Sequence, residues 1–125
     1  MNIEEFRDYC LSMPGAEEKM PFTGISSVKD RDLLVFQVGG KWFCFVDVDG
    51  FEYCDLKCEP DKAVELRELY EGVKPGYHMN KRHWISIYFG TDVNDETIRE
   101  LVRNSYNLVV KSLNKQQREA LASLP

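Results

Sequence analysis

Apolar residues recur at every third or fourth position in three stretches of the chain, a spacing typical of amphipathic helices. The first stretch covers residues 3–13, where Asn2 can cap the helix and Glu5 follows three residues later, as in a capping box. The second covers residues 60–72 and begins with a proline, a residue suited to the first turn of a helix. The third covers about residues 95–113. The sequence therefore predicts three helices.

Between the first two helices the pattern changes to short runs rich in aromatic and β-branched residues, which favour strands. These runs cover residues 33–38, 41–48 and 51–58. The pairs Gly39-Gly40 and Asp49-Gly50 separate them, and both pairs are typical of tight turns between antiparallel strands. We therefore expect a three-stranded antiparallel meander.

Two further strands are expected between the second and third helices. Residues 73–77 form a short run that contains Pro75, so this strand should lie at an edge of the sheet. Residues 83–89 alternate, with Trp84, Ser86 and Tyr88 on one face and apolar side chains on the other. The order of helix, three strands, helix, two strands and helix favours a two-layer α+β sandwich over a parallel βαβ fold.

Two segments carry weaker patterns. Residues 16–32 contain Pro21, Gly24 and mixed charges, so we expect a loop there, with a short strand near residues 25–28 as an option. The tail of residues 114–125 is expected to add one or two helical turns.

The composition is that of a small globular protein. A length of 125 residues predicts one domain over residues 1–125, and 43% hydrophobic residues are enough for a core without disulfides or metal. A net charge of −5 excludes a protein that covers nucleic acid or anionic membrane with its whole surface. The start lacks the features of a signal peptide, and no apolar run is long enough to span a bilayer. We therefore expect a cytoplasmic protein with four reduced cysteines.

The charge is unevenly distributed along the chain. Residues 1–71 contain 16 acidic and 8 basic residues, whereas residues 72–91 contain Lys74, Lys81 and Arg82 and no acidic residue. The same short segment holds both histidines of the chain and several aromatic residues. Cations contact phosphates, and aromatic rings stack on bases or sugars, so this segment indicates a nucleic-acid contact. The alternative is a solvated hairpin tip without a partner.

Cysteine and histidine suggest two other kinds of site. Cys54, Cys58 and the two histidines superficially resemble a zinc site, but cysteines four positions apart on one strand lie roughly 13 Å apart, too far for one metal ion. Cys58 precedes a helix start, which favours a thiolate, whereas the neighbouring Glu59 disfavours it. A pair of Cys58 with His78 or His83 stays open beside a buried structural thiol. No phosphate-loop, dinucleotide or hydrolase motif occurs, so a binding protein is favoured over an enzyme.

Nearly the whole chain resembles the MmcQ/YjbR family, most specifically in the run GVKPGYHMNKRHWISI over residues 72–87. The runs LVFQVGGKWFCF over residues 34–45 and LKCEPDKAVELRE over residues 56–68 add to it. The resemblance implies an α-β3-α-β2-α fold, with an antiparallel five-stranded sheet and helices on one face, similar to secretion chaperones. Members are small bacterial cytosolic proteins, mostly of unknown function and often described as DNA-binding. The resemblance implies no catalytic residue.

Three functional hypotheses follow. The first is a non-enzymatic binding module that contacts DNA through basic β-hairpin tips. The second is a chaperone-like, protein-binding homodimer, and the third is a small-ligand binder or enzyme around His78, His83 and Cys58. No cofactor, metal ion, membrane contact or catalytic residue is expected. The residues assigned to DNA binding are Lys41, Lys74, Tyr77, His78, Asn80, Lys81, Arg82, His83 and Trp84.

Overall fold

The structure is a computed structural model of the chain and describes residues 1–20, 33–77 and 79–124. Within these ranges the helices and strands follow one another in the expected order, with one additional strand near the N-terminus. The helices are α1 (Ile3–Leu11), α3 (Pro60–Leu69), α4 (Asp95–Ser112) and α5 (Lys115–Ala122). The strands are β1 (Glu17–Lys19), β2 (Leu33–Val38), β3 (Lys41–Asp47), β4 (Tyr53–Lys57), β5 (Val73–Pro75) and β6 (Trp84–Tyr88).

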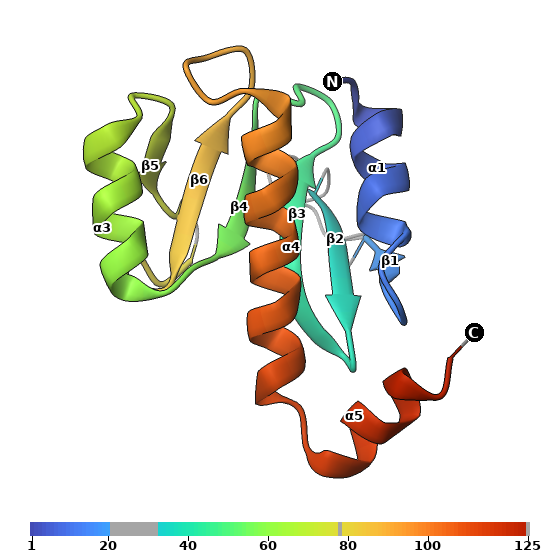
Figure 1. The fold of residues 1–125 in the computed structure, drawn as a ribbon. Helices are drawn as coiled ribbons and strands as arrows, with labels where there is room; N and C mark the ends of the chain where they lie inside the picture. Colours follow the sequence, from blue (N-terminus) through green and yellow to red (C-terminus); the bar gives the residue numbers. More distant parts are fainter. Residues whose placement is uncertain (21–32, 78, 125) are drawn as a thin grey trace, which may run out of the picture.

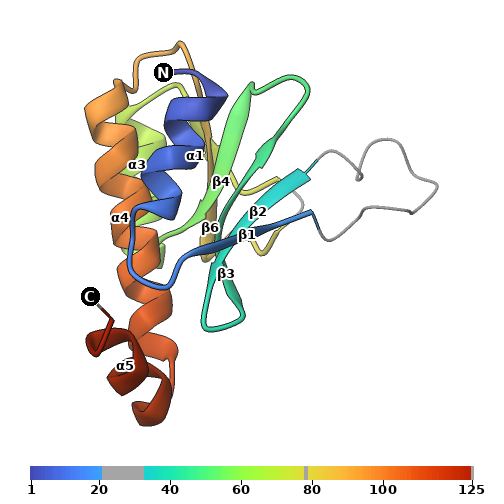
Figure 2. The same cartoon turned by 90° about the vertical axis from the view of Figure 1, so that its right-hand side faces the viewer.

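The strands form an antiparallel sheet in the order β1-β2-β3-β4-β6-β5. Helices α1, α3 and α4 cover one face of this sheet (Figures 1 and 2). The structure thus confirms the expected α+β architecture and the meander of β2, β3 and β4. It also confirms that the strand containing Pro75 lies at an edge.

Over the residues that the structure describes, the sheet has six strands in place of the five expected. The additional strand, β1, lies in the stretch of residues 16–32 for which we expected a loop, and it pairs with β2 from Glu17↔Gln37 to Lys19↔Val35. Its three residues, two glutamates and a lysine, have no apolar alternation, so pairing at a sheet edge and not burial makes them a strand. The optional strand near residues 25–28 lies outside the described residues.

The main hydrophobic core fills the space between the helices and the sheet. The ring of Phe6 on α1 lies edge-on to Phe36 and Phe89, with centroids 6.1 and 5.6 Å apart. The long helix α4 buries an apolar stripe in the same core, as its spacing predicts. All four cysteines of the chain are buried and unpaired, so they act as core residues. The buried apolar residues of α4 are Ile98, Leu101, Val102, Tyr106 and Val109.

One hydroxyl group joins α4 to two strands at the point where those strands separate. β3 and β4 pair directly over only three residues each. Beyond that point the Ser105 hydroxyl accepts the N–H of Lys57 at 2.8 Å and donates to the carbonyl of Phe43. Ser105 is fully buried, so its hydroxyl supplies the hydrogen bonds that the two diverging backbones can no longer exchange.

The two glycine-containing turns of the meander differ from each other. Gly39 and Gly40 have φ values of 59° and 77°, as a two-residue hairpin turn requires, so that prediction is confirmed. The expected tight turn at Asp49-Gly50 is wrong, because residues 48–52 form a longer connection in which Phe51 adopts a φ of 44°. The Phe51 ring stacks on Phe89 with centroids 4.1 Å apart, and this contact stabilises the unusual backbone conformation.

The sheet face opposite the helices carries a second, smaller apolar cluster. It consists of Leu33, Val35, Phe45 and Trp84, with partly buried side chains packed against it. The Phe45 ring lies 6.1 Å from the rings of both Trp42 and Trp84. Because these cluster residues are buried, this end of the sheet is not an open apolar surface.

The C-terminal helix α5 confirms the helical turns expected for the tail. None of its described side chains is buried, and Gln117 donates a hydrogen bond of 3.4 Å to the carbonyl of Gly39. Within the ranges that the structure describes, no helix has both the length and the apolar character needed to cross a membrane.

Replacing Ser105 tests the role of its hydroxyl. We expect Ser105→Ala to lower the free energy of unfolding by about 1–3 kcal/mol, because two buried backbone groups lose their partner. Ser123→Ala removes an exposed hydroxyl at the end of α5 and should change it by less than about 0.5 kcal/mol. Urea denaturation compares the two variants, and equal effects would contradict this account.

Candidate nucleic-acid interface at the β5–β6 connection

Residues 76, 77 and 79–83, here called the basic loop, lie between β5 and β6, and Asn80 organises the backbone that follows it. The Asn80 side-chain oxygen accepts the N–H of Arg82 at 2.9 Å. Its backbone carbonyl accepts the N–H groups of His83 and Trp84 at 3.2 and 3.0 Å. Asparagine favours turns because its side chain bonds the backbone two residues later. Asn80, one of the residues assigned to DNA binding, therefore holds the backbone of the loop.

Gly76 lies so close to β6 that no larger residue fits there. Its N–H donates to the carbonyl of Trp84 at 3.0 Å, and a Cβ atom at position 76 would lie 2.7 Å from both the Cβ and the carbonyl oxygen of Trp84. Trp84 is itself buried, with 7% of its surface exposed. Trp84 therefore packs against the first residue of the basic loop and exposes little surface to a ligand.

Four cationic or titratable side chains predicted for the site are exposed around the basic loop: Lys74, Lys81, Arg82 and His83. Lys81 Nζ donates to the carbonyl of Gly76 at 3.3 Å. Among the described residues, no carboxylate lies within ion-pair distance of the two lysines or the arginine. These three cations therefore form no direct ion pair with a described residue, and the Lys81 ammonium group points back to the carbonyl of Gly76.

The acid nearest in effect to Lys74 is Asp92, with which it forms no direct ion pair. The backbone N–H groups of Gly72 and Glu71 lower the pKa of Asp92, and the charge of Lys74 adds a smaller effect in the same direction. Lys74 is therefore partly shielded by Asp92.

Three tyrosines lie beside these cations on the helix-free face of the sheet. The Tyr53 ring lies 6.0 Å from Tyr77 and 5.4 Å from Tyr88, measured between centroids. Tyr77 is 39% exposed, so its ring is accessible from solvent. Tyr53 was not predicted, because only the pairing of β4 with β6 brings it to this place.

Asp55 is the second residue that sequence reasoning missed. It lies on β4, fully buried, between Phe45 on β3 and Ser86 on β6. The Ser86 hydroxyl donates to Asp55 Oδ1, whereas Oδ2 has no hydrogen-bond partner among the described residues. Burial raises the pKa of Asp55 to about 7, and the Ser86 hydrogen bond and the charge of Lys81 act in the opposite direction.

One predicted site residue, Lys41, lies apart from the basic loop. Lys41 lies at the β2–β3 hairpin, where its Nζ donates to the backbone carbonyl and the hydroxyl of Ser112 at 3.3 and 3.4 Å. β4 separates β3 from β6, so the two hairpin tips belong to different parts of the sheet end. Lys41 is therefore bound to the C-terminal end of α4, where a cation is favoured. His78 lies outside the described residues.

The sequence profile of the YjbR family matches residues 11–108. The chain belongs to the YjbR family. The Escherichia coli O157:H7 protein YbdF is 36% identical over 102 residues, covering 81% of this chain and 84% of YbdF. The Escherichia coli K12 protein YjbR is 31% identical over 125 residues, covering 99% of this chain and all of YjbR. Both relatives are named as uncharacterized proteins.

Solved structures resemble this YjbR-family chain over most of its length. The crystal structure of Deinococcus radiodurans DR2400, described as a DUF419 domain, has a TM-score of 0.84 at 31% identity and covers 99% of this chain and 89% of its own. A Pseudomonas syringae protein has a TM-score of 0.68 at 26% identity, covering 86% of this chain and 98% of its own. These similarities support the fold, and their names state no ligand.

The geometry around Cys58 does not support an activated thiol in this YjbR-family protein. Its side chain is buried in the helix-side core, and burial, reinforced by Glu59, raises the thiol pKa to about 11. The N–H of Cys58 donates to the carbonyl of His83 at 2.8 Å, but the His83 side chain is exposed. No group of three potential metal ligands occurs among the described residues.

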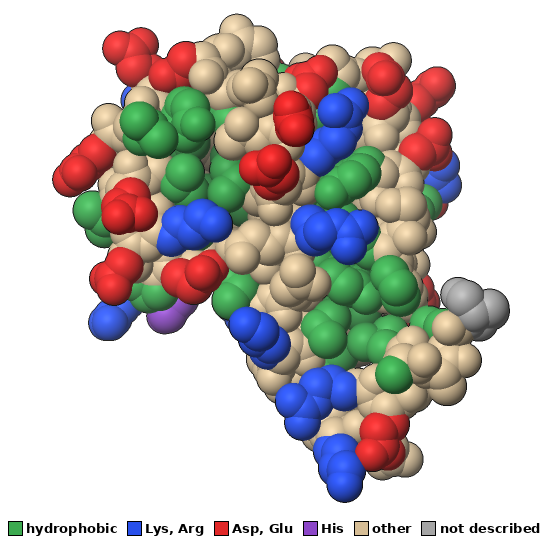
Figure 3. Space-filling view, viewed as in Figure 1, with side chains coloured by type: hydrophobic (Ala, Val, Ile, Leu, Met, Phe, Trp, Pro, Cys, Tyr) green, Lys and Arg blue, Asp and Glu red, His purple; other side chains and the backbone are tan. Residues whose placement is uncertain are grey.

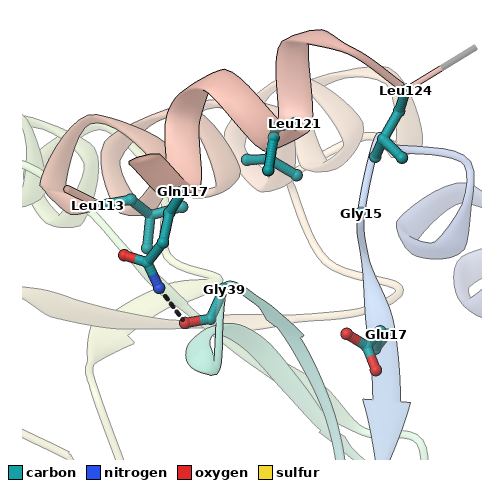
Figure 4. A pocket seen from close by; sticks show the side chains of 8 residues that line it. Gly15, Glu17, Gly39, Leu113, Gln117, Leu121 and Leu124 are labelled. Atoms are coloured by element: carbon teal, nitrogen blue, oxygen red, sulfur yellow. Dashed lines mark hydrogen bonds between the residues drawn. The ribbon is translucent and has the colours of Figure 1, made fainter. Parts of the chain in front are cut away.

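A separate pocket of about 260 Å³ lies under α5 (Figure 4). Leu113, Leu121 and Leu124 give it an apolar wall, and Gly15 and Gly39 lie opposite them. None of the predicted site residues lines this pocket, so it is distinct from the basic loop.

The helix-covered side of the molecule separates its charges (Figure 3). Acidic side chains gather over its upper part, and basic side chains gather along the lower part of α4 and over α5. Both helices supply these cations, which are Arg103, Lys111, Lys115 and Arg118. This second basic region serves below as a matched control for the basic loop.

The buried carboxyl group predicts a pH-dependent stability. Because the pKa of Asp55 rises from about 3.9 in an unfolded chain to about 7 in the folded state, the folded state binds the proton more tightly. The Asp55 contribution to the free energy of unfolding should therefore be fully present below pH 4 and be lost as the pH rises to about 7. The loss is on the order of a few kcal/mol.

Urea denaturation at pH 5 and pH 8 measures this loss. The stability difference between the two pH values should shrink in Asp55→Asn, whose amide cannot ionise, and persist in Asp61→Asn, which changes an exposed carboxylate on α3. Identical pH profiles for the wild type and Asp55→Asn would refute the assignment.

Proposed function

We propose that this YjbR-family protein is a non-enzymatic module that binds the DNA backbone through the basic loop and the adjacent Lys74. Lys74, Lys81 and Arg82 contact phosphates, and Tyr77 and His83 flank them. The observation that carries the proposal is the exposure of three cations around one loop, with no carboxylate in ion-pair distance among the described residues. Residues 1–125 act as one domain in the cytoplasm, where reduced cysteines are stable.

The construction of the loop favours such contacts. Asn80 accepts three backbone hydrogen bonds that fix the second half of the basic loop. Gly76, the first residue of the loop, donates a hydrogen bond to the carbonyl of Trp84 on β6. Backbone that is held at Gly76 and Asn80 before binding loses less conformational entropy when a phosphate engages the neighbouring side chains. The rest of the molecule carries the excess negative charge, since the net charge of the chain is −5. Repulsion between that charge and DNA orients the basic loop toward the duplex.

The two alternative functions have less support. A chaperone-like role would be favoured by an open apolar face of the sheet opposite the helices, but Val35 and Phe45 on that face are buried. A small-ligand or enzymatic role around Cys58 would need a reactive thiol, whereas this thiol is buried and its pKa is raised. DNA binding at the basic loop therefore remains the preferred proposal.

Removing two cations from the basic loop tests this function. We expect Lys81→Ala combined with Arg82→Ala to weaken binding to a duplex at least about tenfold at low salt, because two of three phosphate contacts are lost. Fluorescence anisotropy with a labelled duplex measures the affinity. The matched control, Lys115→Ala with Arg118→Ala on α5, removes the same charge from the second basic region and should leave affinity within about twofold.

The salt dependence gives a second readout of the same contacts. Three phosphate contacts predict a slope of roughly −2.7 for log K against log salt, and the loop double variant should reduce that slope by about two units. Equal losses in the two double variants would show that overall charge, not the basic loop, drives binding. Absence of wild-type binding at low salt would rule the proposal out.

A further inference from the structure

A chain of hydrogen bonds links the buried carboxylate to the ammonium group of Lys81. The Ser86 hydroxyl donates to Asp55 Oδ1 and accepts the N–H of Tyr77 at 2.9 Å. That N–H belongs to the Gly76–Tyr77 peptide, whose carbonyl oxygen accepts from Lys81 Nζ at 3.3 Å. One peptide group therefore stands between the two charges, with its N–H directed to the anionic end and its C=O to the cationic end.

This arrangement, here called the Asp55–Lys81 relay, couples the two charges. The peptide dipole is aligned so that an ionised Asp55 and a protonated Lys81 stabilise each other through it. Asp55 is fully buried and its Oδ2 has no hydrogen-bond partner among the described residues. A buried carboxylate needs compensation of its charge, and among the described residues the relay supplies it.

A phosphate that binds Lys81 competes with this relay. When the ammonium group turns from the Gly76 carbonyl to a phosphate, the Asp55 carboxylate loses the cationic end of its chain and faces an additional negative charge. Protonation of Asp55 removes that unfavourable charge. We infer that binding of a DNA phosphate at Lys81 is coupled to uptake of one proton by Asp55 through the Asp55–Lys81 relay.

The inference rests on the proposed function and names its regulation: DNA affinity rises as the pH falls. The coupling is reciprocal, so protonation of Asp55 strengthens phosphate binding by the same factor by which phosphate strengthens protonation. Asp55 is therefore a positioning residue, which acts on the ligand through Lys81 and does not touch it.

Other titratable groups share this side of the sheet. Tyr53 and Lys57 lie on the same strand as Asp55. On β3, the charge of Asp47 contributes to raising the pKa of Tyr53. Lys74 on β5 lies opposite Ser86 in the sheet. Burial raises the pKa of Tyr53, and the charge of Asp55 adds to the effect, so its phenol stays neutral near pH 7. Histidine is the side-chain type that titrates in the same range, so the two histidines of the chain need a control.

The first experiment needs no DNA. In two-dimensional amide spectra recorded from pH 5 to pH 9, the Tyr77 amide signal should shift with a midpoint near 7, because its hydrogen-bond acceptor Ser86 responds to the charge of Asp55. The shift should disappear in Asp55→Asn and in Ser86→Ala, and persist in the double variant His78→Gln with His83→Gln. A Tyr77 signal that titrates unchanged in Asp55→Asn would overturn the relay.

The second experiment measures coupling to DNA. Wild-type affinity should rise at least about threefold from pH 8 to pH 6, the size expected for a nearby charge. Asp55→Asn should bind at pH 8 as tightly as the wild type does at pH 6 and show no further change, whereas the histidine double variant should keep the wild-type trend.

Calorimetry of the wild type provides a measurement that requires no variant. At pH 7.5, the apparent binding enthalpy should differ between two buffers of different ionisation enthalpy, which reports proton uptake on binding. Binding that is tight, independent of pH and without proton uptake would overturn the coupling and leave the proposed function intact. No binding at either pH would overturn the proposed function and the coupling together, even if the Tyr77 signal still titrates.

Discussion

The pairing of β4 with β6 is the constraint on which the other features of the molecule depend. These strands are separated along the chain by α3 and β5, yet they pair over five residues, from Tyr53↔Tyr88 to Lys57↔Trp84. On the helix side the pairing closes the core with alternating apolar residues of both strands. On the other side it brings Asp55 beside Ser86, and at its end the N–H of Cys58 bonds the carbonyl of His83. The basic loop therefore starts from a fixed position in the sheet.

Local patterns in the sequence predict most of this fold, because helix spacing and strand alternation are properties of neighbouring residues. The Gly39-Gly40 turn is one example, since a positive φ at both positions selects glycine. The failures are those that depend on distant contacts. At Asp49-Gly50 the tight turn gives way to a connection held by the stacking of Phe51 on Phe89. β1 forms because β2 offers an edge to pair with, and its own three residues carry no such signal.

The candidate site likewise contains residues that the sequence predicts and residues that only the structure reveals. Counting charges along the chain finds Lys74, Lys81 and Arg82, because no acidic residue lies between positions 72 and 91. Charge counting does not identify Asp55 as a site residue, since a polar residue that alternates with apolar ones is normally expected to face solvent. Only the register with Phe45 and Ser86 reveals that it is buried. Lys41 follows the Gly39-Gly40 turn, and sheet order, which the sequence does not display, places that hairpin apart from β6.

The burial of Asp55 is costly, and its position suggests why the fold tolerates the cost. A buried carboxyl with an unfilled acceptor position is less stable than an apolar residue of similar size would be. Costs of this kind are concentrated at functional sites in natural proteins, where a charge is needed and not merely accommodated. Three phosphate contacts alone give weak binding with a shallow salt dependence. Under the proposed coupling, a carboxyl group that gives up its negative charge when phosphate arrives removes a repulsion that the exposed cations would otherwise have to overcome. The hydrogen bonds from Asp55 through Ser86 to the Gly76–Tyr77 peptide also hold the carbonyl to which Lys81 donates. In this proposal one buried side chain therefore acts on Lys81 both with and without phosphate.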